Sequence, residues 1–125
     1  MSTFKVIKAI KGISCCSNNG LYQIDSDRVI IGSYNKICIV NIDKGSIESE
    51  IKDNKLGAVR CFIKLRDNKT ILCGCDKGMF CLLDLNTKEY TLQENNSHTI
   101  NDILSLSQEL LISCSDDKTI KIWKY

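Results

Sequence analysis

The residues best suited to chemistry in this sequence are a single histidine, His98, and eight cysteines. Histidine titrates near neutral pH, and a cysteine beside a base is a strong nucleophile. A catalytic pair would need one of these thiols next to His98 in a cleft. Six cysteines instead stand beside isoleucine and leucine in strand-like runs: Cys38, Cys61, Cys73, Cys75, Cys81 and Cys114. The other two, Cys15 and Cys16, are adjacent. We interpret the cysteines of the strand-like runs as free, buried thiols.

The cysteine spacing does not predict a metal site. Cys73 and Cys75 are two residues apart on an expected strand, so their side chains should share a face. The sequence has no Cys-x-x-Cys pair, however, and one histidine leaves zinc short of ligands. We therefore expect no metal and no cofactor.

The composition indicates in which cellular compartment the protein lies and which classes of partner are not expected. Many unpaired thiols indicate a reducing compartment. Lysines interrupt the first eleven residues, unlike a secretory leader, and no apolar run approaches the length of a membrane span. The net charge of +2 comes without a basic stripe. We expect a cytoplasmic protein, with the nucleus as the alternative, and neither a membrane nor a nucleic-acid partner.

Two further motifs resemble ion- or phosphate-binding sites but are better explained as tight turns. Asp116 and Asp117 could form a carboxylate pair or a calcium loop, yet no EF-hand spacing surrounds them, and aspartate favours tight turns. The stretch from Gly74 to Gly78 lacks the spacing of a phosphate-binding loop and any helix after it. We expect both to be hairpin turns.

The sequence repeats with a period of about 40 residues. Two sets of equivalent positions fix the phase: Gly32, Gly74 and Cys114, and Val40, Leu83 and Trp123. In each copy, two short apolar runs flank a polar turn, a pattern that favours a β-hairpin over a helix. A period of this length is typical of solenoids and propellers.

Each repeat is expected to contain four strands. A strand precedes every hairpin, at Leu21 to Ile24, Val59 to Leu65 and Ile100 to Leu106. A more polar fourth strand follows the first two hairpins, at Ser46 to Ile51 and Lys88 to Gln93. Apolar central strands and a charged outer strand are typical of a propeller blade. The third unit has no fourth strand, and we interpret Phe4 to Ile10 as an outer strand that could supply it in a closed ring.

The residues resemble the WD-repeat β-propeller family, most clearly in the third unit, where Ser113 to Trp123 follow the family's pattern and Ser97-His98-Thr99 stands for its glycine-histidine. The resemblance implies a structural hydrogen-bond tetrad of His98, Ser113, Asp117 and Trp123. Asp117 would accept a proton from His98, which would contact Ser113, which would reach the Trp123 indole. The first two units depart from this pattern, with Val40 and Leu83 in place of tryptophan, Asn35 and Lys77 in place of aspartate, and no histidine.

The expected fold is therefore all-β, a partial WD-repeat propeller of about three four-stranded antiparallel blades. The chain would be a single repeat domain, with an outer strand and linker at 1–18 and blades at 19–52, 53–94 and 95–125. A three-blade arc leaves an apolar face at each end, because propellers close with four to eight blades. The chain should either continue into further blades or self-associate, two arcs making a six-blade ring.

The resemblance implies a non-catalytic scaffold that holds a protein or peptide partner, with His98 as a structural brace and no catalytic residue. The alternative is a regulatory or substrate-recruiting C-terminal part of a larger enzyme, such as a kinase or a ubiquitin ligase component. The resemblance further implies that partner contacts concentrate on the face that carries the turns between second and third strands and the starts of the first strands. The candidates there are Tyr34, Asn35, Lys55, Arg60, Lys77, Asn101, Asp102 and Asp116.

Overall fold

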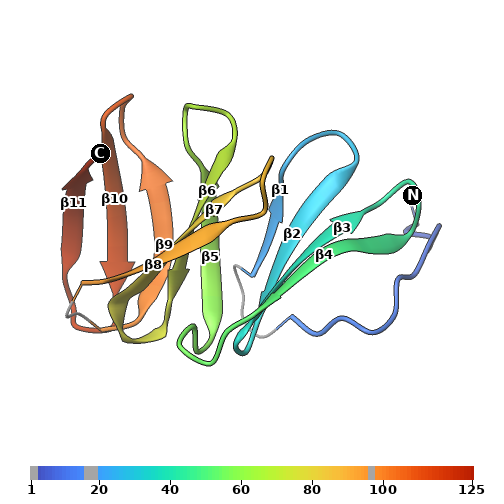
Figure 1. Cartoon of the computed structure of the whole chain (residues 1–125), viewed down its shortest axis with the longest axis horizontal. Helices are drawn as coiled ribbons and strands as arrows, with labels where there is room; N and C mark the ends of the chain where they lie inside the picture. Colours follow the sequence, from blue (N-terminus) through green and yellow to red (C-terminus); the bar gives the residue numbers. More distant parts are fainter. Residues whose placement is uncertain (1–2, 16–19, 96–97) are drawn as a thin grey trace.

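The computed structural model describes residues 3–15, 20–95 and 98–125, and in these residues it contains three antiparallel sheets (Figure 1). Blade 1 consists of β1 (Leu21–Gln23), β2 (Arg28–Ser33), β3 (Lys36–Asn41) and β4 (Ser46–Lys52). Blade 2 consists of β5 (Val59–Lys64), β6 (Thr70–Cys75), β7 (Met79–Asp84) and β8 (Tyr90–Glu94). Blade 3 consists of β9 (Ile100–Ser105), β10 (Leu110–Ser115) and β11 (Ile120–Lys124). The expected all-β fold of about three blades is confirmed.

The turns between the second and third strands share one backbone feature, a residue with positive φ. These residues are Asn35, Lys77 and Lys118, with φ of 57°, 60° and 67°. Asparagine tolerates this left-handed region, whereas lysine is held there by the hairpin around it. Lys77 lies in a single 3-10 turn, η1 (Asp76–Gly78), which joins β6 to β7. The turn expected around Asp116 is thus present. Of the stretch from Gly74 to Gly78, only Asp76–Gly78 forms the turn, because Gly74 and Cys75 belong to β6.

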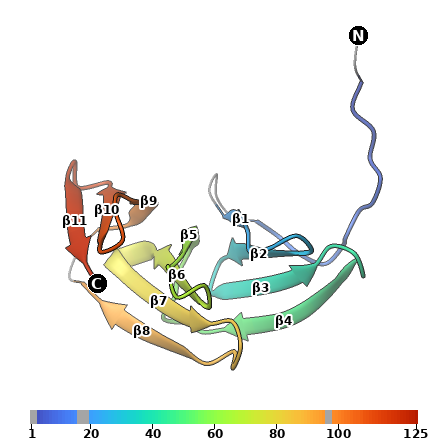
Figure 2. The same cartoon turned by 90° about the horizontal axis from the view of Figure 1, so that it is seen from above.

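The blades stack side by side in an arc (Figure 2). The first strands β1, β5 and β9 lie along its inner side, where β5 contacts both of the others, and β4 and β8 lie along the outer side. Sheet order follows chain order within each blade, so every connection is a short hairpin. This radial arrangement places all turns between second and third strands at one end of the stack. We call this end the hairpin end.

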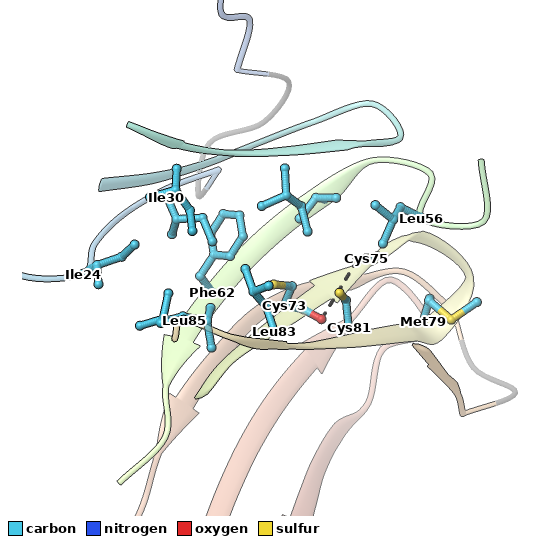
Figure 3. Packing of buried hydrophobic residues seen from close by; sticks show 14 residues of the cluster. Ile24, Ile30, Leu56, Phe62, Cys73, Cys75, Met79, Cys81, Leu83 and Leu85 are labelled. Atoms are coloured by element: carbon cyan, nitrogen blue, oxygen red, sulfur yellow. Dashed lines mark hydrogen bonds between the residues drawn. The ribbon is translucent and has the colours of Figure 1, made fainter. Parts of the chain in front are cut away.

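Apolar side chains fill the space between neighbouring blades. The cluster between blades 1 and 2 includes Ile30, Phe62 and Leu83, together with the thiols of Cys73 and Cys81 (Figure 3). A second cluster between blades 2 and 3 is built around Phe80, Ile103, Leu111 and the half-buried Trp123. Each inter-blade contact buries apolar area, at about 25 cal/mol per Å², and this burial holds one sheet against the next.

Glycine is required where one blade approaches the next most closely. A Cβ on Gly32 would lie 2.5 Å from the backbone oxygen of Val59, on the first strand of blade 2. A Cβ on Gly74 would lie 2.5 Å from the Cys61 Sγ and 2.7 Å from the Ile100 Cγ2 of blade 3. The glycines that mark the repeat in the sequence therefore permit inter-blade packing, since neither has a positive φ.

Cysteine thiols fill part of this interior. Cys38, Cys61, Cys73, Cys75 and Cys81 are buried, as expected. Cys73 and Cys75 lie in one cluster, and the Cys75 thiol donates to the Cys73 carbonyl at 4.0 Å. Cys114 is exposed, so its expected burial is wrong: among the described residues no further blade covers its strand face. Cys16 lies outside the described residues.

The strand expected at Phe4 to Ile10 is wrong, because this segment forms no strand. No strand in the described part of the chain lies beside it to supply a hydrogen-bond ladder, and the Phe4, Val6 and Ile7 side chains are almost fully exposed. The segment is attached to blade 1 instead by Lys8, whose ammonium donates to the Ile42 carbonyl at 2.9 Å.

One apolar face of blade 3 is exposed, whereas the equivalent face of blade 2 is buried against blade 3. Leu104, Ile120 and Ile122 are 62%, 68% and 64% exposed. Their equivalents in blade 2, by strand register, are Ile63, Phe80 and Leu82, which pack against blade 3. We call the surface of Leu104, Ile112, Cys114, Ile120 and Ile122 the open face of blade 3. It matches the apolar end expected of an incomplete ring.

Candidate functional site at the hairpin end

The β2–β3 turn fixes the loop that follows β4. Asn35 donates its backbone N–H to the Gly57 carbonyl at 2.7 Å, and its Oδ1 accepts from the Gly57 N–H at 2.8 Å. The Asn35 carbonyl also accepts from the Asp53 N–H at 3.0 Å. Asn35 thus holds the loop against the turn through both its backbone and its short amide side chain. Asn35 was expected on a partner-binding face, and these contacts give it a structural role.

Asp76, in blade 2, fixes the other side of the same loop. Its Oδ2 accepts from the Ala58 N–H at 3.0 Å, and its Oδ1 accepts from the Arg60 Nε at 3.0 Å. Burial opposes ionisation of this carboxyl, but the Ala58 N–H and the Arg60 guanidinium together hold the pKa of Asp76 below its ordinary value. Gly57 allows the approach, because its φ is +63° and a Cβ there would lie 2.9 Å from the Asp76 Cβ.

These contacts shape a cavity of about 370 Å³ between blades 1 and 2, which we call the blade 1–2 cavity. Its lining residues are Tyr34, Asn54, Lys55, Leu56, Gly57, Asp76, Lys77, Met79 and Glu94. Leu56 and Met79 are buried, whereas Tyr34 is exposed. Three side chains expected at a partner-binding face, Tyr34, Lys55 and Lys77, come from three different loops and meet here.

The remaining candidates divide into paired residues and one outlier. Arg60 forms an ion pair with Asp76, and at the equivalent place in blade 3 the Asn101 Nδ2 donates to the Asp116 Oδ1 at 2.7 Å. Asp102 lies apart from the cavity, on the side of blade 3 that carries the open face, and shares a second cavity with Leu104 and Ile120.

Sequence reasoning missed Asn54, Met79 and Glu94, which also line the blade 1–2 cavity. Glu94 is the last residue of β8, and Met79 is the first of β7, directly opposite it in the register. The signal that could have found Met79 and Glu94 is the strand end itself, whereas Asn54 lies within the β4–β5 loop. A cavity between two hairpin ends is lined by the residues at which strands start and stop.

The tetrad implied by the resemblance is only partly present. The Trp123 indole donates to the Ser113 Oγ at 2.8 Å, and the Trp123 ring packs edge-on against Phe80 with centroids 5.1 Å apart. Among the described residues His98 makes no hydrogen bond, and its side chain is exposed. The expected contacts of His98 with Asp117 and Ser113 are therefore not formed, and Ser97 lies outside the described residues.

Local contacts occupy the Asp117 carboxylate instead. Its Oδ1 accepts from the Thr119 N–H at 3.0 Å and from the Thr119 hydroxyl, and its Oδ2 pairs with the Lys121 ammonium at 3.2 Å. The Thr119 hydroxyl, with help from Lys121, lowers the pKa of Asp117 to about 2. The Asp117 carboxylate reaches Thr119, two residues away, within the same turn. His98 lies far from Asp117 in the sequence and would have to approach it across the end of the blade.

Within residues 3–15, 20–95 and 98–125, no three His, Cys, Asp or Glu side chains gather closely enough to hold a metal ion. No helix in that part of the chain has the length and apolar character needed to cross a membrane.

Comparison with known families places the C-terminal repeat. The family described as WD domain, G-beta repeat matches residues 86–124. The match begins before β8 and ends on the last residue of β11, so one sequence repeat covers the outer strand of blade 2 and the three strands of blade 3. A comparison with curated proteins gave no match. Residues 86–124 thus match a WD repeat, and this match supports the expected resemblance to the WD-repeat family in the part of the chain that it covers.

Proposed function

We propose that this chain is a non-catalytic interaction module that holds a protein or peptide partner at its hairpin end. WD repeats generally mediate protein–protein interaction, and residues 86–124 belong to that family. The observation that carries the proposal is the convergence of Tyr34, Lys55 and Lys77 from three loops on one cavity. Loops held on a rigid scaffold are the usual place for recognition, and exposed tyrosine is enriched at binding hot spots.

The rigid support for this surface comes from both blades that flank it. The β4–β5 loop is fixed on one side by Asn35 and on the other by Asp76. The Tyr90 hydroxyl also donates to the Asp53 Oδ2 at 2.9 Å, which ties the start of the loop to the outer strand of blade 2. A partner would meet a surface that is already ordered, and binding to an ordered surface loses less conformational entropy.

The open face of blade 3 supports a second element of the proposal. Three isoleucine and leucine side chains, Leu104, Ile120 and Ile122, stand where blade 2 packs against its neighbour. We propose that this face is covered by further blades of a longer chain or by a second copy. The arc would thereby form part of a complete ring, with blades at 19–52, 53–94 and 95–125 as its contribution.

A photocrosslinking experiment tests the location of partner binding. A photoreactive phenylalanine derivative is placed at Tyr34, or at Asn86 in the β7–β8 turn at the opposite end, and the chain is illuminated in cell extract. We expect discrete protein adducts from position 34 at several times the yield from position 86, and competition by unlabelled chain. Equal yields from the two positions would contradict the proposal.

A further inference from the structure

The blade 1–2 cavity carries a concentration of cations that lack ion-pair partners. The structure pairs most basic side chains of the described residues with carboxylates or carbonyl oxygens, as for Arg28 with Asp25. Lys55 and Lys77 form no ion pair within the described part of the chain, yet both line this one cavity. They come from different loops, one from the β4–β5 loop and one from η1. Asp53 attracts Lys55, but its two oxygens already accept from a backbone N–H and a tyrosine hydroxyl.

The acidic residues of the cavity do not cancel this charge. Asp76 is already matched by Arg60 and by the Ala58 N–H, so its carboxylate is occupied. Glu94, at the end of β8, is the one other acidic residue of the lining, which also contains the two lysines. The Tyr34 hydroxyl, on an exposed ring at the rim, adds a neutral hydrogen-bond donor. The uncompensated positive charge of the two lysines therefore favours a ligand with an anionic group.

The blade 1–2 cavity lies among exposed loops, where a side chain of a bound peptide can enter it. Its volume of about 370 Å³ is large enough to hold such a side chain. Buried Leu56 and Met79 line it as well, while the lysines and Tyr34 reach it from exposed positions on the loops.

From this geometry we infer that the blade 1–2 cavity binds an acidic side chain of an extended peptide, with its carboxylate between Lys55 and Lys77 and its backbone beside Tyr34. The inference rests on the proposed function, because it names the chemistry of the partner. The two lysines make the binding weaken as the ionic strength rises, because salt screens exposed charges. The screening length is about 10 Å at 0.1 M salt.

A selection from random peptides tests the chemistry that this cavity recognises. A random heptapeptide library is first depleted on the full chain carrying both Lys55→Glu and Lys77→Glu, and then selected on the unaltered chain. The depletion removes peptides that bind elsewhere, including on the open face of blade 3. We expect the remaining peptides to be enriched in aspartate and glutamate several-fold over the starting library. Peptides without acidic enrichment, or no enriched peptide, would overturn the inference.

Measured affinities of one selected peptide locate its carboxylate. Each of Lys55→Glu and Lys77→Glu should weaken binding about three- to tenfold, because each replaces an attraction with a repulsion. Glu94→Gln should strengthen binding about twofold, since it removes a like charge. Lys44→Glu, in the β3–β4 turn at the opposite end, makes the same change in net charge and serves as the control. Equal weakening by Lys44→Glu would overturn the inference.

Failure of the inference and failure of the proposed function give different results. Neutral or basic peptides that still require this cavity, together with crosslinks from position 34, would remove only the acidic specificity. Equal crosslinking at positions 34 and 86 would remove the partner-binding role of the hairpin end itself. Circular dichroism of every variant checks that the chain remains folded.

Discussion

Substitution of Gly32 by alanine tests the packing of blade 1 on blade 2. The new Cβ would lie 2.5 Å from the Val59 carbonyl oxygen and 3.0 Å from both the Val59 Cβ and the Phe62 Cζ. Carbon atoms in contact are normally about 3.5 to 4.0 Å apart. Because the closest atom belongs to the backbone of β5, no side-chain rotation can relieve the overlap, and blade 2 must move away from blade 1.

The magnitude follows from two opposing effects. Overpacking of a close-packed interior costs about 1 to 3 kcal/mol, and a backbone contact places Gly32 at the upper end of that range. Alanine also restricts the unfolded chain, which offsets about 0.4 to 1 kcal/mol. We therefore expect Gly32→Ala to lower the free energy of unfolding by about 2 kcal/mol. Gly74→Ala should cost less, about 1 kcal/mol, because the atoms it meets belong to the Cys61 and Ile100 side chains.

Urea unfolding followed by far-UV circular dichroism, at one fixed protein concentration, measures these differences. The matched control is Cys114→Ala, at the equivalent position on the open face of blade 3, where we expect a change of less than about 0.5 kcal/mol. The expected order of destabilisation is Gly32, then Gly74, then Cys114. A Gly32→Ala chain as stable as the unaltered one would refute the packing of β2 against β5.

Three further predictions concern single side chains. Trp123→Ala should lower the free energy of unfolding by about 3 kcal/mol, measured by urea titration, because it removes a half-buried ring and its hydrogen bond. Asp117 has its pKa lowered to about 2 in the fold, so its contribution to stability is complete above the ordinary value near 4 and is lost as the pH falls toward 2; the stability difference between the unaltered chain and Asp117→Asn should shrink over this window. Burial raises the pKa of the Cys61 thiol to about 12, so Cys114 should react with a thiol reagent at pH 8 many times faster than Cys61, as read by peptide mass spectrometry, and comparable rates would contradict the assigned burial.

The sequence predicts the strands well because each is specified locally. Apolar runs bounded by asparagine, aspartate and glycine set every hairpin, and the period of about 40 residues aligns the three units. The segment Phe4 to Ile10 has the same local composition yet forms no strand. A strand exists only through hydrogen bonds to a neighbour, and local composition does not reveal whether a neighbour is present.

The candidate site was predictable in location but not in the role of each residue. The repeat phase correctly brings Tyr34, Lys55 and Lys77 to one end of the stack, because equivalent turns of stacked blades point the same way. The sequence does not show that Arg60 is neutralised by Asp76. Nor does it show that Asp117 prefers Thr119, two residues away, to His98. Such choices depend on side-chain reach in three dimensions, and several partners compatible with the spacing compete for each group.

The blades stack radially (Figure 2) and leave the apolar face of blade 3 uncovered. Sedimentation velocity of the chain by itself, over a range of concentrations, tests this claim most directly. We expect concentration-dependent self-association of the unaltered chain and a marked shift toward monomer for the double variant Ile120→Glu with Ile122→Glu, because these substitutions place charge on the exposed face. An unaltered chain that remains a single monomeric species at every concentration, with no response to the double variant, would contradict the account.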